Sequence, residues 1–152
     1  MQRAARVWLL VVSALNGAAG LVCGLLLIAR PDGSLIGASA LLPVIRRFPL
    51  ANVFFQDMFW IGVAMLLALG LPNLIALVAL LRRMSHQYLL SLAAAVLLML
   101  WCGFEMPYMF NYAALAYFFV GAISAACSVW LLGASREANA QQAHRAERHE
   151  VE

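Results

Sequence analysis

Apolar residues are grouped along the chain into four long runs that polar segments separate. The runs are uncharged or nearly so and cover about residues 7–28, 54–81, 88–106 and 112–133. A helix needs about 20 such residues to cross a bilayer, and each run is close to or above that length. The pattern predicts an all-α integral membrane four-helix bundle over residues 1–134, followed by a polar cytoplasmic tail at 135–152.

The composition leads to the same class of protein. The chain has 152 residues, of which 65% are hydrophobic and 11% are charged. An average soluble domain has about 25% charged residues, so this chain is far too apolar to bury its surface in one small core. All ten basic residues are arginine. We read this as the codon bias of a GC-rich bacterial genome, and we expect a multi-pass protein of the bacterial inner membrane.

The arginines predict the orientation. Cytoplasmic loops carry an excess of basic residues. With the N-terminus inside, the inner side would hold Arg3, Arg6, Arg82, Arg83, Arg136, Arg145 and Arg148. The outer side would hold Arg30, Arg46 and Arg47. We therefore expect both termini in the cytoplasm and a long first extracytoplasmic loop at 29–53.

The second run is longer than a bilayer requires. At 1.5 Å per residue, residues 54–81 would extend about 42 Å, against about 30 Å of hydrocarbon. Tilt or a kink at 70–73 would absorb the excess, since Pro72 removes a backbone hydrogen bond. We expect Asn73 to satisfy backbone groups that the proline frees.

Two acids lie within the predicted spans, Asp57 in the second and Glu105 in the third, at similar depth toward the outer side. Trp60 and Trp101 lie three or four residues away, on the same helix faces and one turn deeper. Intramembrane acids usually face a cavity. If the two faces meet, they form an outward-opening acidic and aromatic pocket for a small amphiphile, cation or lipid head group. Further candidate ligand-binding residues are Arg46, Arg47 and Asn16.

A structural alternative stays open for both acids. They could pair with the loop arginines, cap helix ends or meet interfacial water. Two close carboxylates could also share a proton and act as an acid–base group, for example in an intramembrane isomerase for lipid-like substrates. Perturbed acids also occur in structural networks, so we favour a binding protein over an enzyme.

Small residues recur every four positions in the first span, at Asn16, Gly20 and Gly24, and in the fourth at Gly121 and Ala125. Such stripes let helices approach closely. They favour packing, either within the bundle or against a membrane partner or second copy of the chain. An accessory or scaffold subunit is therefore the alternative function.

Three segments carry a family resemblance: ARPDGSLIG, QDMFWIGVAMLLALGLPNLIAL and LWCGFEMPYMFNYAALAYFFVG. They resemble a group of small four-span bacterial inner-membrane proteins of uncharacterised activity, over most of residues 7–133, and the resemblance implies the four-helix topology. The chain is also similar to four-span multidrug exporters. Those use a glutamate in the first span, where this chain has Asn16, and the difference argues against proton-coupled export.

Several chemistries have no motif in the sequence. We find no nucleotide-binding loop, zincin motif, nucleophile elbow or Cys/His cluster, and no basic run typical of nucleic-acid binding. We expect no cofactor and no metal. Cys23, Cys102 and Cys127 all lie in apolar runs, where cysteine usually serves as a small core residue.

Overall fold

The structure, a computed structural model, describes residues 1–46, 53–54, 56–108 and 112–151; for 139 and 142–151 only the helical backbone is described. Within this part of the chain the regular elements are helical. The α-helices are α1 (Gln2–Ala29), α2 (Leu42–Ile45), α3 (Phe59–Met65), α4 (Leu71–Leu81), α5 (Gln87–Glu105) and α6 (Tyr112–Val151). Two short 3₁₀ turns, η1 (Ser34–Ile36) and η2 (Ser39–Leu41), and one π-helical segment, η3 (Leu66–Gly70), complete the described elements.

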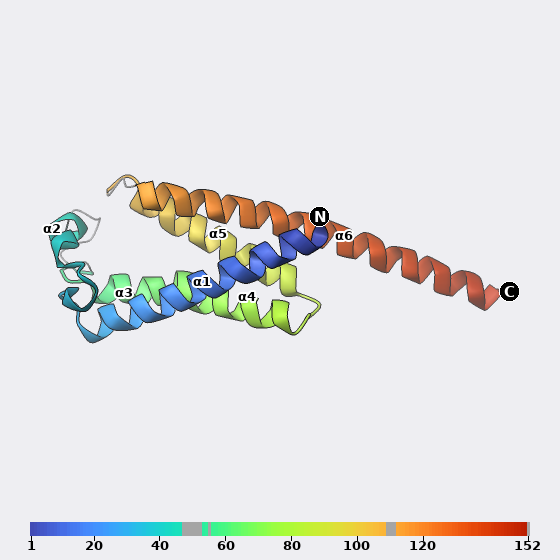
Figure 1. Cartoon of the computed structure of the whole chain (residues 1–152), viewed down its shortest axis with the longest axis horizontal. Helices are drawn as coiled ribbons and strands as arrows, with labels where there is room; N and C mark the ends of the chain where they lie inside the picture. Colours follow the sequence, from blue (N-terminus) through green and yellow to red (C-terminus); the bar gives the residue numbers. More distant parts are fainter. Residues whose placement is uncertain (47–52, 55, 109–111, 152) are drawn as a thin grey trace.

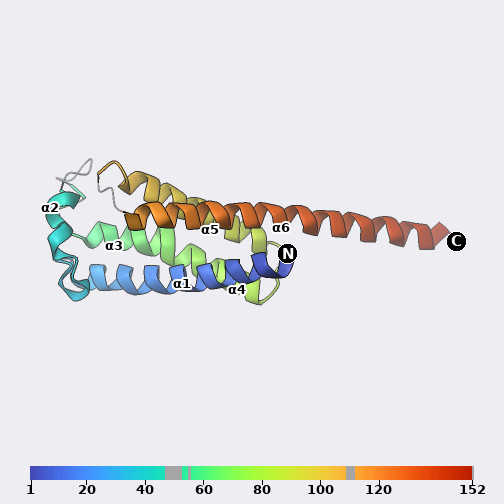
Figure 2. The same cartoon turned by 45° about the horizontal axis from the view of Figure 1, so that its top comes forward.

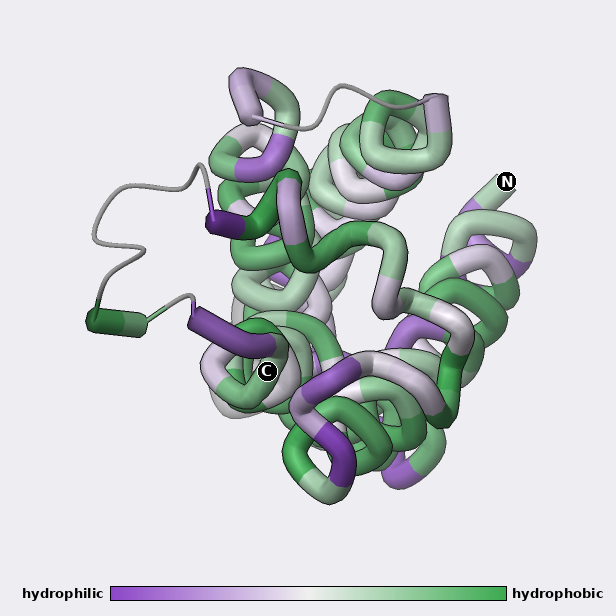
Figure 3. Tube along the Cα trace, turned by 90° about the vertical axis from the view of Figure 1, so that its left-hand side faces the viewer, coloured by the Kyte–Doolittle hydropathy of each residue, from purple (hydrophilic) through white to green (hydrophobic). Residues whose placement is uncertain are grey.

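Four helical segments are long and apolar enough to cross a membrane, which confirms the four predicted runs. They cover Gln2–Ala29, Phe59–Leu81, Gln87–Glu105 and Tyr112–Ala138. Large apolar side chains are exposed along them; on α1 these include Val7, Val11, Leu15, Val22 and Leu25. Helices that are apolar on their outer faces need a lipid environment or a protein cover. Viewed from the end that carries α2, the helices are mostly apolar and hydrophilic residues gather in the connections (Figure 3).

The helices are arranged as two pairs. α5 and α6 lie side by side, and α1 lies along α3, η3 and α4 (Figure 1). The N-terminus and the turn between α4 and α5 lie at one end, and the loop with α2 lies at the other. α6 continues past the N-terminal end of the bundle, so the polar tail is a helical extension (Figure 2).

Glycines hold α1 against the α3–α4 segment. A Cβ placed on Gly20 would lie 2.5 Å from the backbone nitrogen of Gly70. One on Gly24 would lie 2.9 Å from the carbonyl oxygen of Gly62, and one on Gly62 would lie 2.8 Å from the carbonyl oxygen of Gly24. Real Cβ atoms do not come this close to backbone, so the two helices meet at backbone distance because these residues have no side chain.

The predicted kink occurs as a change of helix type. The chain is π-helical over Leu66–Gly70, and Pro72 lies in the first turn of α4. A proline cannot donate to the carbonyl four residues back, and a π-helical turn is one way to accommodate that loss. The Asn73 side chain donates from Nδ2 to the Leu69 carbonyl at 2.8 Å. Asn73 therefore bonds a backbone carbonyl beside the irregular segment, as predicted, but this is the Leu69 carbonyl and not the Ala68 carbonyl that loses its α-helical donor at Pro72.

The second apolar helix begins five residues later than predicted, at Phe59 rather than residue 54. Its start is set by side-chain and loop contacts instead of hydropathy: Met58 donates its backbone N–H to the Pro31 carbonyl at 2.9 Å. The remaining 23 residues extend about 35 Å, close to the hydrocarbon thickness of about 30 Å. Little tilt is therefore needed to fit this helix into a bilayer.

The glycine contact predicts a large effect of one methyl group. We expect Gly20→Ala to lower the free energy of unfolding by about 1–3 kcal/mol, because its Cβ would force apart the backbones of α1 and η3. The measurement is unfolding of the purified protein in mixed micelles.

Gly133→Ala is the matched control, because a Cβ there meets nothing within 4 Å. We expect it to leave stability unchanged or raise it by up to about 1 kcal/mol, the helix-propensity difference between the two residues. Equal stability of the two variants would contradict the close approach at Gly20.

Candidate functional site

Asp57 lies just before the second apolar helix and is exposed. Its Oδ1 accepts a hydrogen bond from the Phe59 backbone N–H at 2.9 Å. This contact satisfies one of the backbone donors that the first turn of a helix leaves without an intrahelical partner. Asp57 therefore bonds to the start of a helix, in line with the structural alternative given above. A ligand-binding role for Asp57 stays a prediction.

Glu105 is the last residue of α5 and is partly buried. Its carboxylate accepts a hydrogen bond from the Trp101 side chain, one turn earlier on the same helix. Glu105 and Trp101 therefore share one face of α5, as predicted, and their side chains are in contact. Trp101 also packs against an apolar cluster that joins α1, α2 and α3, formed by Leu27, Ile45, Met58 and Ile61.

Trp60 and Arg46, which were also predicted for this pocket, lie at the same end of the bundle. Trp60 is 44% exposed and makes edge-to-face contacts with Phe54 and Phe59, at centroid distances of 5.4 and 5.5 Å. Arg46 is exposed at the end of α2. Arg47 lies outside the described residues. Among the described residues, no hydrogen bond joins Asp57 to Glu105; each carboxylate has its partner in its own segment.

The first loop closes this end of the bundle through a tight turn. Gly33 has φ +72°, a conformation that favours glycine, and a Cβ there would also lie 2.7 Å from Met58 Sδ. Ser34 donates to Asp32 Oδ1 from its backbone N–H at 3.0 Å and from its hydroxyl at 2.7 Å. These two hydrogen bonds hold the pKa of Asp32 below its ordinary value. The turn brings Met58 and Ile45 together above α1.

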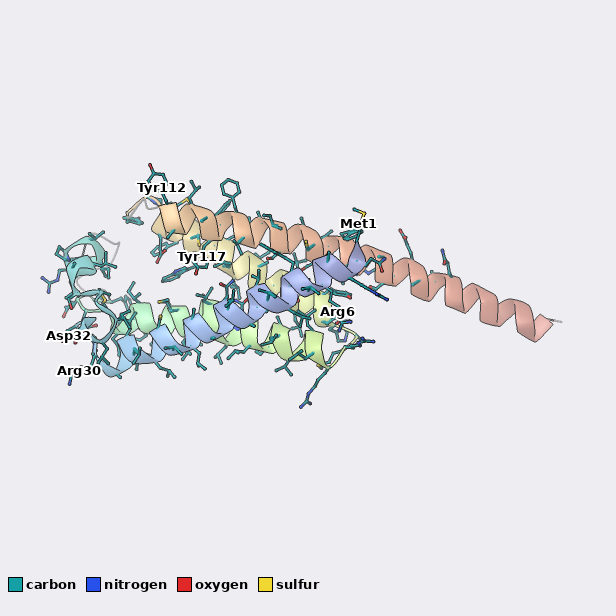
Figure 4. All side chains as sticks on the ribbon, in the orientation of Figure 1. Met1, Arg6, Arg30, Asp32, Tyr112 and Tyr117 are labelled. Carbon is teal, nitrogen blue, oxygen red and sulfur yellow. The ribbon has the colours of Figure 1, made fainter. Side chains whose placement is uncertain are left out.

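A hollow lies elsewhere, between α1 and α6. It is a lateral groove of about 320 Å³, and we call it the α1–α6 groove. Its lining residues are Trp8, Val11, Val12, Leu15 and Asn16 of α1 and Ala116, Tyr117 and Val120 of α6. The two helices approach near the N-terminus of α1, where Leu9 and Leu131 belong to one buried cluster. Tyr117 projects from α6 toward α1 (Figure 4).

Hydrogen bonds define one end of the groove. Trp8 donates from Nε1 to Ser124 Oγ at 3.1 Å, which links α1 to α6. Ser124 in turn donates its hydroxyl to the Val120 carbonyl at 2.7 Å. The indole N–H is thereby occupied. No residue lining the groove is charged.

Asn16 is the polar residue at the inner wall of the groove. It is 4% exposed, and its buried Nδ2 has no hydrogen-bond partner within the protein. Asn73 has the same exposure, 4%, but its Nδ2 is bonded to Leu69. A buried amide without a partner costs about 1–3 kcal/mol. The structure thus places an unpaired hydrogen-bond donor beside an apolar groove.

Asn16 also borders a small pocket of about 10 Å³ at the centre of the bundle. Buried polar side chains from all four long helices line it: Ser13, Asn16, Asn73, Ser91 and Ser124. Its volume is at the lower limit for one water molecule. Asn16 therefore separates this polar centre from the apolar groove.

Of the predicted site residues, only Asn16 lines the groove. The sequence analysis did not identify the other lining residues, which include Trp8, Ala116, Tyr117 and Val120. The four-residue spacing of Trp8, Val12 and Asn16 places them on one face of α1, so the sequence alone could have identified this face. Which helix that face meets depends on tertiary packing, and no local pattern encodes it.

The small-residue positions are used inside the chain. Gly20 and Gly24 face η3 and α3, as described above. Gly121 faces α5, where an added Cβ would lie 2.7 Å from Met99 Cγ, and Ala125 is partly buried. A role of these residues toward a partner or a second copy stays a prediction.

The described cysteines are all free thiols. Cys102 and Cys127 belong to apolar clusters of the bundle, as expected of core residues. The described residues contain no group of three or more His, Cys, Asp or Glu side chains that could hold a metal ion.

Comparisons with protein-family models, with curated proteins and with solved structures found no match. The resemblance to small four-span proteins therefore stays a prediction.

The Asp57 contact predicts a difference between two substitutions. We expect Asp57→Ala to lower the free energy of unfolding by about 0.5–2 kcal/mol, because it removes the acceptor of the Phe59 N–H. Asp57→Asn keeps an acceptor oxygen and should be close to wild type. Unfolding in mixed micelles measures both. If Asp57→Asn loses as much stability as Asp57→Ala, the negative charge and not the hydrogen bond from the Phe59 N–H is what the protein needs.

Proposed function

We propose that this chain is a multi-pass membrane protein that binds a neutral amphiphile in the α1–α6 groove, with the Asn16 amide donating a hydrogen bond to an oxygen atom of the ligand. The observation that carries the proposal is the unpaired, buried Nδ2 at the wall of an apolar groove. A carbonyl, ester or hydroxyl oxygen on an apolar chain or ring would supply the missing acceptor.

The dimensions and chemistry of the groove support this ligand class. Ligand sites in proteins have volumes of about 300–1,000 Å³ and are mostly apolar with a few placed polar groups. At about 320 Å³, the groove is at the lower end of that range. It fits one alkyl chain or ring system better than a complete phospholipid. Because its lining is uncharged, a cation would lose its hydration there without a compensating partner.

A membrane location is supported by the four apolar helices and by the arginines. Arg3, Arg6, Arg82 and Arg83 lie at the N-terminal end of the bundle, and α6 carries Arg136 beyond it. Arg30 lies at the opposite end, beside Asp32 (Figure 4). We infer that the N-terminal end is cytoplasmic and that the protein resides in a bacterial inner membrane.

A labelling experiment tests the orientation. Single cysteines are placed at Ser34 and at His86 in a variant in which Cys23, Cys102 and Cys127 are serine or alanine. In intact cells with a permeabilised outer membrane, a membrane-impermeant maleimide should label position 34 and not position 86. Labelling of position 86 alone would contradict the orientation.

Asn16→Leu tests the site, because stability and binding should change in opposite directions. Leucine has a similar branched shape and no donor, so the variant loses the penalty of an unpaired buried amide. We expect its free energy of unfolding to rise by about 1 kcal/mol. Its affinity for a monoacylglycerol should fall about fivefold, the value of one membrane hydrogen bond of about 1 kcal/mol. Ligand-induced shifts of the thermal midpoint measure this affinity.

Asn73→Leu is the matched control, since Asn73 is equally buried but already bonded. It should lose stability and keep the affinity for monoacylglycerol. An alkane of the same chain length should stabilise wild type and Asn16→Leu equally, because it has no acceptor. If Asn16→Leu binds monoacylglycerol as wild type does, the proposal is wrong and the amide belongs to the polar centre instead.

A further inference from the structure

A second hollow lies at the N-terminal end of the bundle, where α1 meets the end of α4. It has a volume of about 490 Å³. Three arginines line it, Arg3 and Arg6 from α1 and Arg83 from the turn after α4. The other lining residues are apolar: Val7, Leu10, Leu80 and Leu81. We call it the arginine pocket. None of the residues of the α1–α6 groove belongs to it.

Arg6 is held in place by the end of α4. Its Nη2 donates to the Leu80 carbonyl at 2.6 Å. A carbonyl in the last turn of a helix lies at the negative end of the helix dipole, which favours a cation there. A guanidinium has five N–H donors, and this bond uses one of them. The side chain is therefore positioned, and it retains donors for a second acceptor.

Arg83 occupies a position where glycine is the usual residue. α4 ends at Leu81, with Arg82 as its C-cap, and Arg83 has φ +52°. Met84 donates its backbone N–H to the Ala79 carbonyl at 3.0 Å, and Arg83 to the Leu80 carbonyl at 3.4 Å. These two bonds form the Schellman motif that ends many helices, in which glycine commonly takes the left-handed position. An L-residue there is strained, so the arginine side chain costs stability at this site.

The pocket is strongly basic. In the part of the chain that the structure describes, no carboxylate forms an ion pair with Arg3, Arg6 or Arg83. Arginine binds phosphate through parallel N–H bonds, and basic pockets between membrane helices bind anionic lipid head groups. The neighbouring Val7 is 56% exposed and Leu81 is 65% exposed, on the bundle surface that borders the arginines. A phosphate with attached acyl chains matches this arrangement.

We propose that the arginine pocket binds an anionic phospholipid, with the phosphate on Arg3, Arg6 and Arg83 and the acyl chains along Val7 and Leu81. The proposal depends on the membrane location, but not on the ligand of the α1–α6 groove.

Native mass spectrometry of the detergent-purified protein tests the proposal, with phosphatidylglycerol as the probe and phosphatidylcholine as its zwitterionic counterpart. Wild type should bind phosphatidylglycerol more tightly. Arg83→Gln should lower that affinity about tenfold, the effect of losing one hydrogen bond between charged groups. Arg82→Gln is the matched control, because it removes the same charge from the adjacent residue, which does not line the pocket. It should change the affinity less than twofold.

A second variant separates binding from folding. Arg83→Gly removes the side chain and relieves the left-handed strain. In a nonionic detergent without lipid, its thermal midpoint should rise by about 2–4 °C. Its affinity for phosphatidylglycerol should fall as in Arg83→Gln. A loss of binding in a variant of higher stability cannot be explained by unfolding.

Three results would overturn the proposal. The first is an equal loss of affinity in Arg82→Gln and Arg83→Gln, which would mean that general surface charge attracts the lipid. The second is equal binding of phosphatidylcholine. The third is binding of free glycerol 3-phosphate as tight as that of phosphatidylglycerol, which would make the pocket a site for a soluble phosphate and not for a lipid.

Discussion

The contact between Gly20 and Gly70 is the constraint on which the rest of the bundle depends. It brings the backbone of α1 against η3, and Gly24 and Gly62 extend the contact toward the loop end. In the membrane location proposed above there is no hydrophobic driving force between helices, so close van der Waals packing has to hold them together. Because α1 packs along α3, η3 and α4, its described contacts with α6 lie near the N-terminus of α1. The α1–α6 groove is the space that this geometry leaves.

Two residues are unfavourable for folding and lie at the two hollows. Asn16 keeps a buried amide without a partner, although Asn73 shows that this bundle can satisfy an equally buried asparagine. Arg83 takes a left-handed conformation that glycine would adopt without strain. Stability alone would favour leucine at the first position and glycine at the second. Residues that lower stability are expected where function requires them.

Much of the fold follows from local patterns. The four apolar helices were predictable from run length, and the irregularity near residue 70 from Pro72, because both depend on nearest neighbours in sequence. The start of the second helix was not predictable from run length. It depends on the hydrogen bond from the Phe59 N–H to the Asp57 side chain and on the bond from Met58 to Pro31 in the first loop. The groove was also beyond prediction, because it results from which helix faces meet. For Glu105 and Trp101 the spacing along one helix was enough to predict that they share a face, but not what else Trp101 packs against.

Photolabelling shows whether a ligand binds in the α1–α6 groove. The protein is irradiated in membranes with a diazirine-bearing monoacylglycerol, with and without excess unlabelled monoacylglycerol, and the adducts are mapped by peptide mass spectrometry. Saturable adducts are expected on the groove segments 8–16 and 116–120, and in Asn16→Leu about fivefold more probe should be needed to saturate them. Saturable adducts confined to the other end, around Trp60 and Glu105, or labelling that excess lipid does not reduce, would contradict ligand binding in this groove.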